Sequence, residues 1–476
     1  MLIRTLALSA SILGLVSCAS AAPATSVAPA ETQAVPETRI ADLVGQVQKE
    51  APYPALAVSV RKGDEVIYES AIGISDLEQD TLATTDSVFA VGSLTKSFTS
   101  IAISQLAAAG KVDLTAPVGT YLTDYTGPAK DAPVWTLMNH TSGLVNYTAQ
   151  PDFPQGTRQK LTRREMRDMF EGDDLMFSPG SAFSYSNSGT YLLGLIVEAI
   201  SGQTYEQYLD ESVLTPLGLS HTYYNRPERI IPHRAEGYIV TENGYENAPL
   251  LEPLIPFSAG ALASTLEDIQ HYIDTVHRKN LLGDEVRNTL YTQKPFPDGE
   301  PNPYSLGALV IRDWEGHRKI AHAGDIDGFS AYMAYYPDDD VSIVVLANTR
   351  NVSPTPVGIE QKIARIIFNA PRPADAAAPL TADKIASLVG DYDIGRMRIG
   401  LDRVGIVEQN GGLALRFGGT AAPGDAIPLI RISGMSFYAA HDDEMVLSFS
   451  DGTDSGAADL MVDYVGGTFA FYKTKE

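Results

Sequence analysis

The chain has 476 residues, of which 44% are hydrophobic and 20% are charged. This composition can bury a substantial core and excludes a globally disordered chain, a coiled coil and a collagen. The formal net charge of −24, without a cluster of basic residues, excludes a nucleic-acid-binding protein, and the single cysteine, Cys18, excludes a disulfide framework or a cysteine-rich metal site.

The first 38 residues are typical of an exported protein. Arg4 precedes an apolar run over residues 6–16 that is too short to cross a bilayer, so residues 1–17 are predicted to be a secretory signal peptide. Leu15-Val16-Ser17-Cys18 resembles the bacterial lipobox, which predicts lipidation of Cys18. Residues 18–38 would then be a flexible tether, and the lipid would anchor a periplasmic protein to a membrane of the bacterial cell envelope. Ordinary cleavage after Ala21, which leaves a soluble exported protein, is the alternative.

Residues 39–368 form the predicted main body. Short apolar or alternating runs indicate a hairpin or meander near its start, and a strand pair near its end, at 56–60, 65–68, 70–73, 328–336 and 341–346. Helical periodicity occurs between them, over 93–109, 190–200 and 265–277. Strands at both ends with helices between them predict an α/β body, one sheet with a helical insertion.

The rest of the chain differs in composition. Residues 369–379 are rich in Ala and Pro, as in an interdomain linker, and residues 380–476 contain Gly-rich, short alternating runs. These runs predict a small all-β domain, a barrel or a curled sheet. Leu388-Val-Gly-Asp-Tyr392 resembles the opening of a lipocalin-like module. Such a domain could border the active-site cleft, or it could only cover apolar surface of the body.

Three short motifs carry candidate chemistry. Ser93 and Lys96 are three residues apart at the start of a predicted helix, so the amine can reach the hydroxyl that it would activate. An N-cap serine beside a surface lysine is the alternative interpretation. Tyr185 and Asn187 follow a turn, and a phenol beside a lysine can relay protons. His322 and Gly324 precede the last strands.

The order of these motifs resembles that of the serine β-lactamase and penicillin-binding-protein superfamily. The residues within the motifs are most similar to those of its class C β-lactamase-like branch. The resemblance covers about 300 residues. Further stretches that match the family are 89–96, 137–144, 177–180, 214–219 and 258–264. It implies an antiparallel sheet flanked by helices. It also implies that the chain is a serine hydrolase.

The resemblance implies a role for each motif residue. Ser93 would be the acylated nucleophile, with Lys96 and Tyr185 moving protons; which of the two is the general base stays open. Asn187 would contact the substrate amide, and His322 and Gly324 would stand on the strand that lines the cleft. The backbone amides of Ser93 and Asp325 would form the oxyanion hole. His140 belongs to a matching motif and is interpreted as scaffold.

Two departures from class C β-lactamases concern the substrate. His322 stands where those enzymes carry a lysine that binds the antibiotic carboxylate, which lowers the expectation of β-lactam hydrolysis. Asp325 and Asp327 follow, where relatives often have small neutral residues. If their carboxylates face the cleft, they disfavour an anionic substrate and favour an amine or a neutral ester. Alternatively, they only cap local N–H groups in a turn.

The leading hypothesis is an exported serine hydrolase that acts on small molecules or short peptides, either D-amino-acid peptides and amides or carboxylic esters. A β-lactamase or a penicillin-binding D-alanyl-D-alanine carboxypeptidase is one alternative, and a non-catalytic envelope binding module is another. No cofactor or metal is expected, since the histidines lack metalloprotease spacing. An α/β-hydrolase is disfavoured because no Gly-x-Ser-x-Gly elbow occurs. The oligomeric state is not indicated.

Overall fold

The computed structural model describes residues 35–150, 153, 160–370, 379–398, 401–440, 442–450, 459–464 and 467–474. The predicted signal peptide 1–17, Cys18, most of the tether and linker residues 371–378 lie outside the described residues. The described residues from Pro36 onward belong to one unit. In these ranges, no helix combines the length and the apolar character that crossing a membrane requires.

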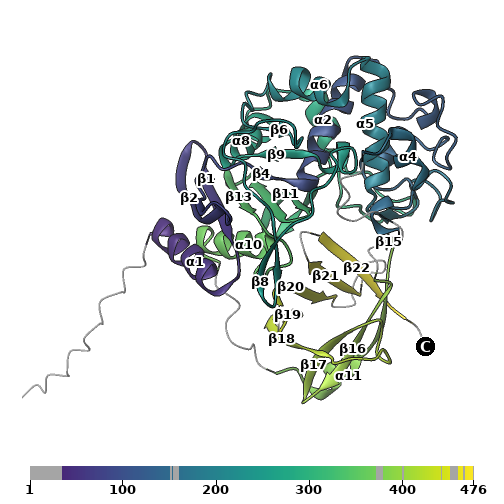
Figure 1. Cartoon of the computed structure of the whole chain (residues 1–476). Helices are drawn as coiled ribbons and strands as arrows, with labels where there is room; N and C mark the ends of the chain where they lie inside the picture. The colour runs from purple at the N-terminus through teal and green to yellow at the C-terminus, as the bar shows by residue number, and fades with distance from the viewer. Residues whose placement is uncertain are drawn as a thin grey trace, which may run out of the picture. The chain divides into compact units, whose positions relative to one another are not determined.

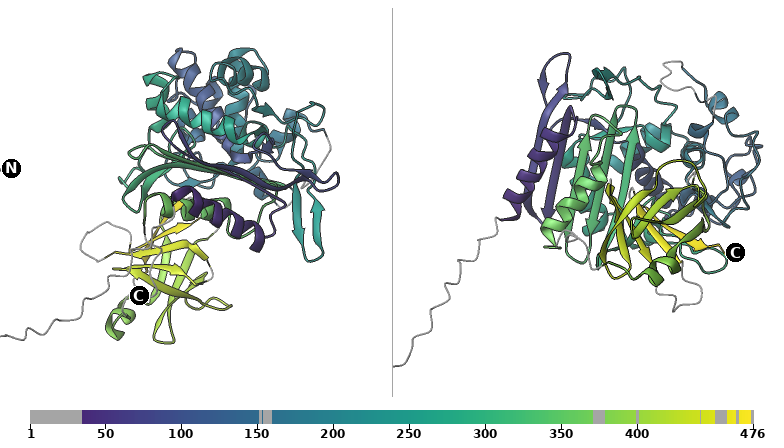
Figure 2. Two further views of the ribbon diagram at one scale, coloured as in Figure 1. Left: turned by 90° about the vertical axis from the view of Figure 1, so that its left-hand side faces the viewer. Right: turned by 90° about the horizontal axis from the view of Figure 1, so that it is seen from below.

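A seven-stranded sheet forms the centre of the body, in the order β10-β11-β12-β13-β1-β2-β3 (Figures 1 and 2). Neighbouring strands are antiparallel. Their bounds are β1 Ala55–Lys62, β2 Glu65–Asp76, β3 Thr81–Leu82, β10 Val310–Trp314, β11 His317–Ile326, β12 Phe329–Tyr336 and β13 Val341–Ala347. Pairing of β1 with β13 joins the two ends of the body, which confirms the predicted fold class. The runs at 65–68 and 70–73 belong to the single strand β2 rather than to two strands.

Successive side chains of the sheet enter two separate cores. Ala57 of β1 packs in the core that contains α2 (Thr95–Ala108) and α8 (Leu266–Tyr272). Its neighbours Leu56 and Val58 pack in the core that contains α1 (Pro36–Glu50) and α10 (Pro356–Ile367). Figure 2 shows helices on both sides of the sheet. A sheet covered on both faces needs apolar residues at nearly every position, which explains why all of β13 is buried.

The helical insertion lies between β4 (Phe89–Ala90) and β10. The predicted helix 93–109 begins as a 3-10 turn, Gly92–Leu94, and continues as α2. The helix predicted at 190–200 is α5, which starts earlier, and the one at 265–277 is α8 continued by a π-helical segment, Ile273–Arg278. The bounds of α5 are Asn187–Ser201, and further helices of the insertion are α3 Val134–Met138, α4 Arg163–Asp168, α6 Tyr205–Leu209, α7 Phe257–Gly260 and α9 Asp284–Tyr291. Its short strands include β5 Phe183–Ser184, β6 Tyr223–Tyr224, β7 Tyr238–Thr241, β8 Gly244–Asn247 and β9 Leu262–Ser264.

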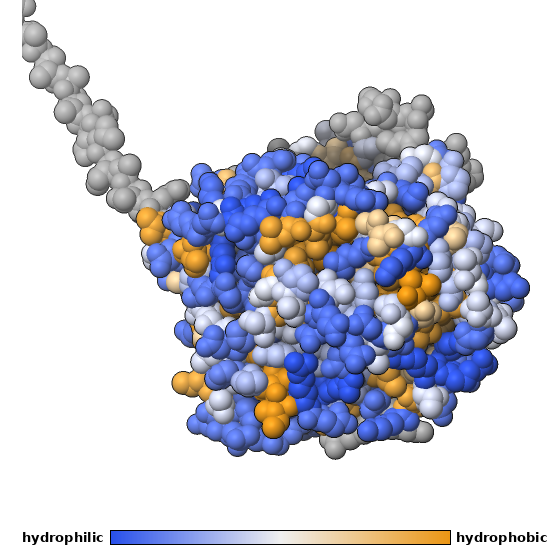
Figure 3. Space-filling view, turned by 90° about the horizontal axis from the view of Figure 1, so that it is seen from above, coloured by the Kyte–Doolittle hydropathy of each residue, from blue (hydrophilic) through white to orange (hydrophobic). Residues whose placement is uncertain are grey.

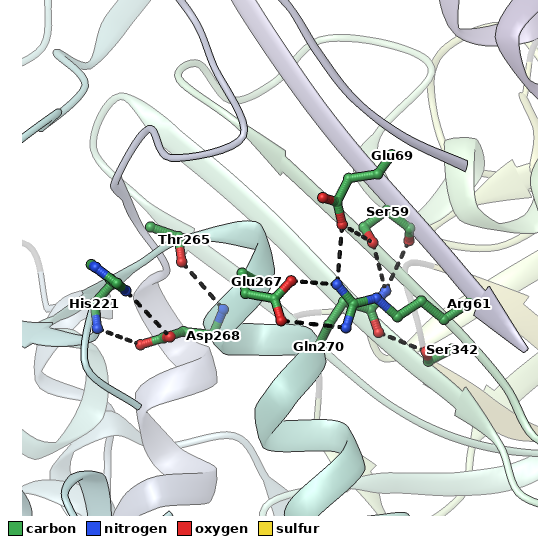
Figure 4. A network of polar contacts seen from close by, with 9 residues as sticks. All are labelled: Ser59, Arg61, Glu69, His221, Thr265, Glu267, Asp268, Gln270 and Ser342. Carbon is green, nitrogen blue, oxygen red and sulfur yellow. Dashed lines mark hydrogen bonds and ion pairs between the residues drawn. The ribbon is translucent and has the colours of Figure 1, made fainter. Parts of the chain in front are cut away.

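Polar contacts hold α8 to the sheet (Figure 4). The buried Gln270 side chain donates to Ser59 Oγ of β1 at 3.2 Å and accepts from Ser342 Oγ of β13 at 2.6 Å. Arg61 of β1 pairs with the more exposed Glu267 of α8. One buried amide and one exposed ion pair therefore link this helix to strands from both ends of the body.

Residues beyond the linker form a closed barrel, here called the C-terminal barrel, which confirms the predicted all-β domain. Because the barrel is closed, its strands leave no unpaired sheet edge. The short helix α11 (Ala382–Leu388) precedes it, and β15 (Met397–Arg398) lies outside its ring of strands. The ring contains β14 Gly390–Ile394, β16 Arg403–Gln409, β17 Gly412–Phe417, β18 Ile427–Ser433, β19 Ser436–Ala439, β20 Asp442–Phe449, β21 Leu460–Tyr464 and β22 Gly467–Lys473.

The face drawn in Figure 3 is mostly hydrophilic, with hydrophobic residues in separate patches. Exposed large hydrophobic side chains belong to different elements, for example Leu82 of β3, Leu281 before α9 and Phe417 of β17. Scattered apolar residues of this kind are ordinary on soluble proteins. The cavities of the body are therefore better candidates for a functional site than this surface.

Candidate active site

Ser93 lies in the 3-10 turn that leads into α2, and Lys96 lies in the first turn of that helix. Lys96 Nζ donates hydrogen bonds to Ser93 Oγ at 2.9 Å and to the carbonyl oxygen of Ala259 at 2.8 Å. Lys96 is 1% exposed, whereas Ser93 is half-buried. The alternative of an N-cap serine beside a surface lysine is therefore wrong, and the N-cap position of α2 belongs to Leu94.

Burial also controls the charge of Lys96. It lowers the pKa of the amine well below its ordinary value of 10.5, because a charged group loses solvation when it leaves water. A lysine with a lowered pKa spends more of its time as the neutral amine at neutral pH. The lone pair of that amine is what a general base needs to accept the Ser93 proton.

Two glycines allow β11 to approach the serine turn. Gly92 has a φ of +49°, and a Cβ at this position would lie 2.8 Å from the carbonyl carbon of Asp325. A Cβ at Gly324 would lie 2.0 Å from the carbonyl oxygen of Val91. Neither approach leaves room for a side chain. The predicted oxyanion hole needs the amides of Ser93 and Asp325, and this contact brings their backbone segments together.

Tyr185 stands between β5 and α5, beside both residues of the first motif. Lys96 Nζ lies 4.9 Å from the centre of the Tyr185 ring. Burial raises the pKa of the Tyr185 hydroxyl; a hydrogen bond with the Ser93 side chain opposes the shift, and the Asp325 charge adds to it. The phenol is therefore protonated at neutral pH, so it can donate a proton but is poorly suited to accept one.

Asn187 is the first residue of α5. Its Nδ2 donates to Thr148 Oγ1 at 3.0 Å, and its backbone N–H donates to Asn146 Oδ1 at 3.1 Å. The side chain lines the same cavity as Ser93. These bonds hold the amide at the cavity wall, the position that contact with a substrate would require.

His322 lies on β11 but is turned into the protein. It is 6% exposed, and among the described residues it does not line the Ser93 cavity. Its Nε2 is 2.7 Å from the Tyr304 hydroxyl, and its Nδ1 is 2.5 Å from the carbonyl oxygen of Ala323. Burial, reinforced by the charge of Lys96, lowers the pKa of His322 to about 3. The imidazole is therefore neutral and supplies no cation for a substrate carboxylate.

Two aromatic residues complete the surroundings of Tyr185. The ring of His140, whose φ is +59°, lies 4.3 Å from the Tyr185 ring and 4.8 Å from the Tyr304 ring. Burial lowers the pKa of His140 well below its ordinary value, and the charge of Lys96 adds to this effect. The Nε2 of His140 is buried without a hydrogen-bond partner among the described residues. His140 was interpreted from its motif as a scaffold residue. Tyr304 was not identified from the sequence, because no local motif contains it.

Asp325 and Asp327 both line the cavity of about 240 Å³ that contains Ser93. Asp327 Oδ1 pairs with Arg350 Nη2 at 2.7 Å, and Arg350 lines the same cavity. The carboxylate of Asp327 is thereby partly neutralised, whereas Asp325 is exposed. Both residues therefore lie at the wall of the cavity where an effect on the charge of a bound substrate was predicted. Arg350 was not identified from the sequence because it is distant along the chain from every motif.

Comparisons with known proteins identify similar sequences and folds. The protein flp of Staphylococcus aureus (strain MW2) is 28% identical over 62% of this chain, and the match spans 59% of that relative's length. Penicillin-binding protein 4* of Bacillus subtilis (strain 168) is 26% identical over 70% of this chain and 78% of its own length. The structure of the octameric penicillin-binding protein homologue from Pyrococcus abyssi shares the fold, with a TM-score of 0.60 and 21% identity over 91% of this chain and 98% of that one.

The family model described as Beta-lactamase matches residues 40–365, which contain the sheet, the helical insertion and all three motifs. One of the curated relatives that the chain resembles is a penicillin-binding protein. The chain therefore belongs to the beta-lactamase family, within the superfamily of serine hydrolases and penicillin-binding-protein homologues.

Proposed function

We propose that the protein hydrolyses amide or ester bonds of small substrates through an acyl-enzyme on Ser93. The observation that carries this proposal is the 2.9 Å contact between Ser93 Oγ and the buried amine of Lys96. Ser93 Oγ attacks the substrate carbonyl, the leaving group departs with a proton, and water then hydrolyses the acyl-enzyme. The amides of Ser93 and Asp325 stabilise the developing oxyanion.

Within this mechanism Lys96 is the general base and Tyr185 is the proton donor. Burial shifts their pKa values in opposite directions: downward for the amine and upward for the phenol. A lowered amine pKa favours the neutral acceptor, and a raised phenol pKa favours the protonated donor. Tyr185 therefore delivers the proton to the leaving group, and Asn187 contacts the substrate amide.

The charges of the cavity support neutral or amine-bearing substrates. Asp325 and Asp327 both line the cavity, the Asp327 and Arg350 charges offset each other, and His322, which lies outside the cavity, is neutral and adds no positive charge nearby. D-amino-acid peptides or amides and carboxylic esters both meet this description. The penicillin-binding relatives support a D-alanyl-D-alanine carboxypeptidase as a second candidate. Efficient β-lactam hydrolysis ranks third because the lysine that would bind the carboxylate is replaced by His322.

Export is a separate part of the proposal. Cys18, in Leu-Val-Ser-Cys, is lipidated after removal of residues 1–17, and the residues from Cys18 up to the start of α1 at Pro36 tether a periplasmic enzyme to the cell envelope. Palmitate labelling that disappears in Cys18→Ala tests this. Absence of any labelling in the parent protein contradicts it.

Intact-mass spectrometry after addition of benzylpenicillin tests the nucleophile, with Ser93→Ala beside it and the antibiotic followed in the same tubes. A persistent adduct that depends on Ser93 indicates a penicillin-binding peptidase, and rapid antibiotic loss indicates a β-lactamase. If neither occurs, a panel of esters and D-amino-acid amides decides between esterase and peptidase. Failure of the whole panel, or full activity in Ser93→Ala, overturns the proposal.

A further inference from the structure

The segment that carries Tyr185 is held from two sides. β5 pairs with β15, the short strand of residues 397–398, so that Met397 lies opposite Phe183. The backbone N–H of Phe183 donates to the carbonyl oxygen of Arg396 at 2.8 Å. On the other side, the N–H of Ser184 donates to the carbonyl oxygen of His140 at 2.9 Å. The two residues before Tyr185 are thus fixed between the body and a segment from the C-terminal part of the chain.

The Arg396 side chain strengthens this attachment. Its Nη1 donates to the carbonyl oxygen of Ser181 at 2.9 Å, and its Nε donates to Asp298 Oδ2 at 2.7 Å. A second contact joins Arg396 Nη2 to the same carboxylate. Glu300 Oε2 lies 3.8 Å from Arg396 Nε. Arg396 therefore ties the turn before β5 to the loop around residue 298.

Apolar packing joins the same parts of the chain. Phe183 and Tyr304 are buried in one core cluster with Ile394 and Met397, and Tyr185 packs partly buried against that cluster. Tyr304 also bonds His322 and contacts the His140 ring. The core that supports the catalytic tyrosine is thus shared between the body and residues of the C-terminal barrel.

We infer that Arg396 and β15 are positioning elements for Tyr185, and that the C-terminal barrel thereby helps to set the proton-transfer geometry at Ser93. The inference rests on the proton-donor role proposed for Tyr185. A displacement of about 1 Å from a productive geometry can cost about 10²-fold in rate. Without the Arg396 contacts, the segment that leads into Tyr185 is free to move. We therefore expect the rate of proton transfer to fall while substrate binding is unchanged.

Arg396→Ala in the full chain tests this, with Arg403→Ala as the matched control. Arg403 pairs with Asp393 inside the C-terminal barrel and carries the same charge. With an alkyl ester such as ethyl acetate, whose alkoxide leaving group must take up a proton, we expect Arg396→Ala to lower kcat about tenfold with KM within twofold. Arg396→Lys, which keeps the charge but not the forked contacts, falls between the parent and Arg396→Ala. Arg403→Ala stays within twofold of the parent.

A double-mutant cycle separates positioning from general weakening of the fold. In a Tyr185→Phe background, Arg396→Ala should cause no further loss of kcat, because the hydroxyl it positions is already gone. Additive losses, or equal effects of Arg396→Ala and Arg403→Ala, overturn the inference. If Arg396→Ala is insoluble, Asp298→Asn replaces it in the same cycle. Activity that survives in Ser93→Ala instead refutes the proposed function, so the two failures are distinguishable.

Discussion

The charge state of Lys96 decides how the site responds to pH. The amine must be neutral to accept the Ser93 proton, and burial has lowered its pKa below 10.5. Activity should therefore fall as the pH drops through that lowered pKa, because protonation removes the lone pair. It should not fall on the alkaline side until the pH approaches the raised pKa of Tyr185.

Lys96→Arg supplies the test of this prediction. Arginine stays charged throughout the accessible range, so kcat/KM should fall by about 10²–10⁴-fold. The exposed Lys62→Arg is the control and should keep the parent pH profile. A Lys96→Arg variant that retains both the rate and the acid limb of the parent would assign the base to another residue.

At the scale of elements, α8 is attached to the sheet by contacts of unequal strength. Gln270 is buried and bonds Ser59 and Ser342, so Gln270→Ala leaves buried hydroxyls without this partner. We expect a loss of about 1–3 kcal/mol in the free energy of unfolding. Glu267, whose side chain is 58% exposed, pairs with Arg61 at the surface. Glu267→Ala should therefore cost less than about 1 kcal/mol.

Urea denaturation with equal m-values for both variants measures the difference. The order of the two effects is the decisive result. If Glu267→Ala destabilises the protein as much as Gln270→Ala does, the ion pair and not the buried amide attaches this helix.

Sequence patterns predicted the elements whose signal is local. The apolar run at 341–346 indicated β13, and the spacing of Ser93 and Lys96 placed amine and hydroxyl on one helical turn. Partners distant in the chain left no such signal. Tyr304 reaches His322 across a β-hairpin, and Phe183 pairs with Met397 more than 200 residues later. Such contacts depend on the tertiary arrangement, which periodicity does not encode.

At the scale of the whole molecule, the cavity around Ser93 adjoins a second one. A cavity of about 310 Å³ shares Leu251, Pro256, Gly260, Ile326 and Asp327 with the cavity around Ser93. Its other walls are mostly apolar and come mainly from residues 225–263 of the helical insertion, together with Val88, Ala90 and Phe329. Substrates with an extended apolar group could therefore bury that group beyond the reacting carbonyl, and each buried methylene contributes about 0.8 kcal/mol.

A series of 4-nitrophenyl esters with acyl chains of increasing length tests this arrangement. We expect kcat/KM to rise with chain length, and Ala248→Phe, in the wall of the second cavity, should abolish the rise while leaving acetate hydrolysis unchanged. Ala116→Phe, in a half-buried loop that lines neither cavity, is the control. If chain length has no effect in the parent, or if Ala248→Phe slows acetate and long esters alike, the second cavity does not take the substrate, and specificity is set within the space around Ser93 alone.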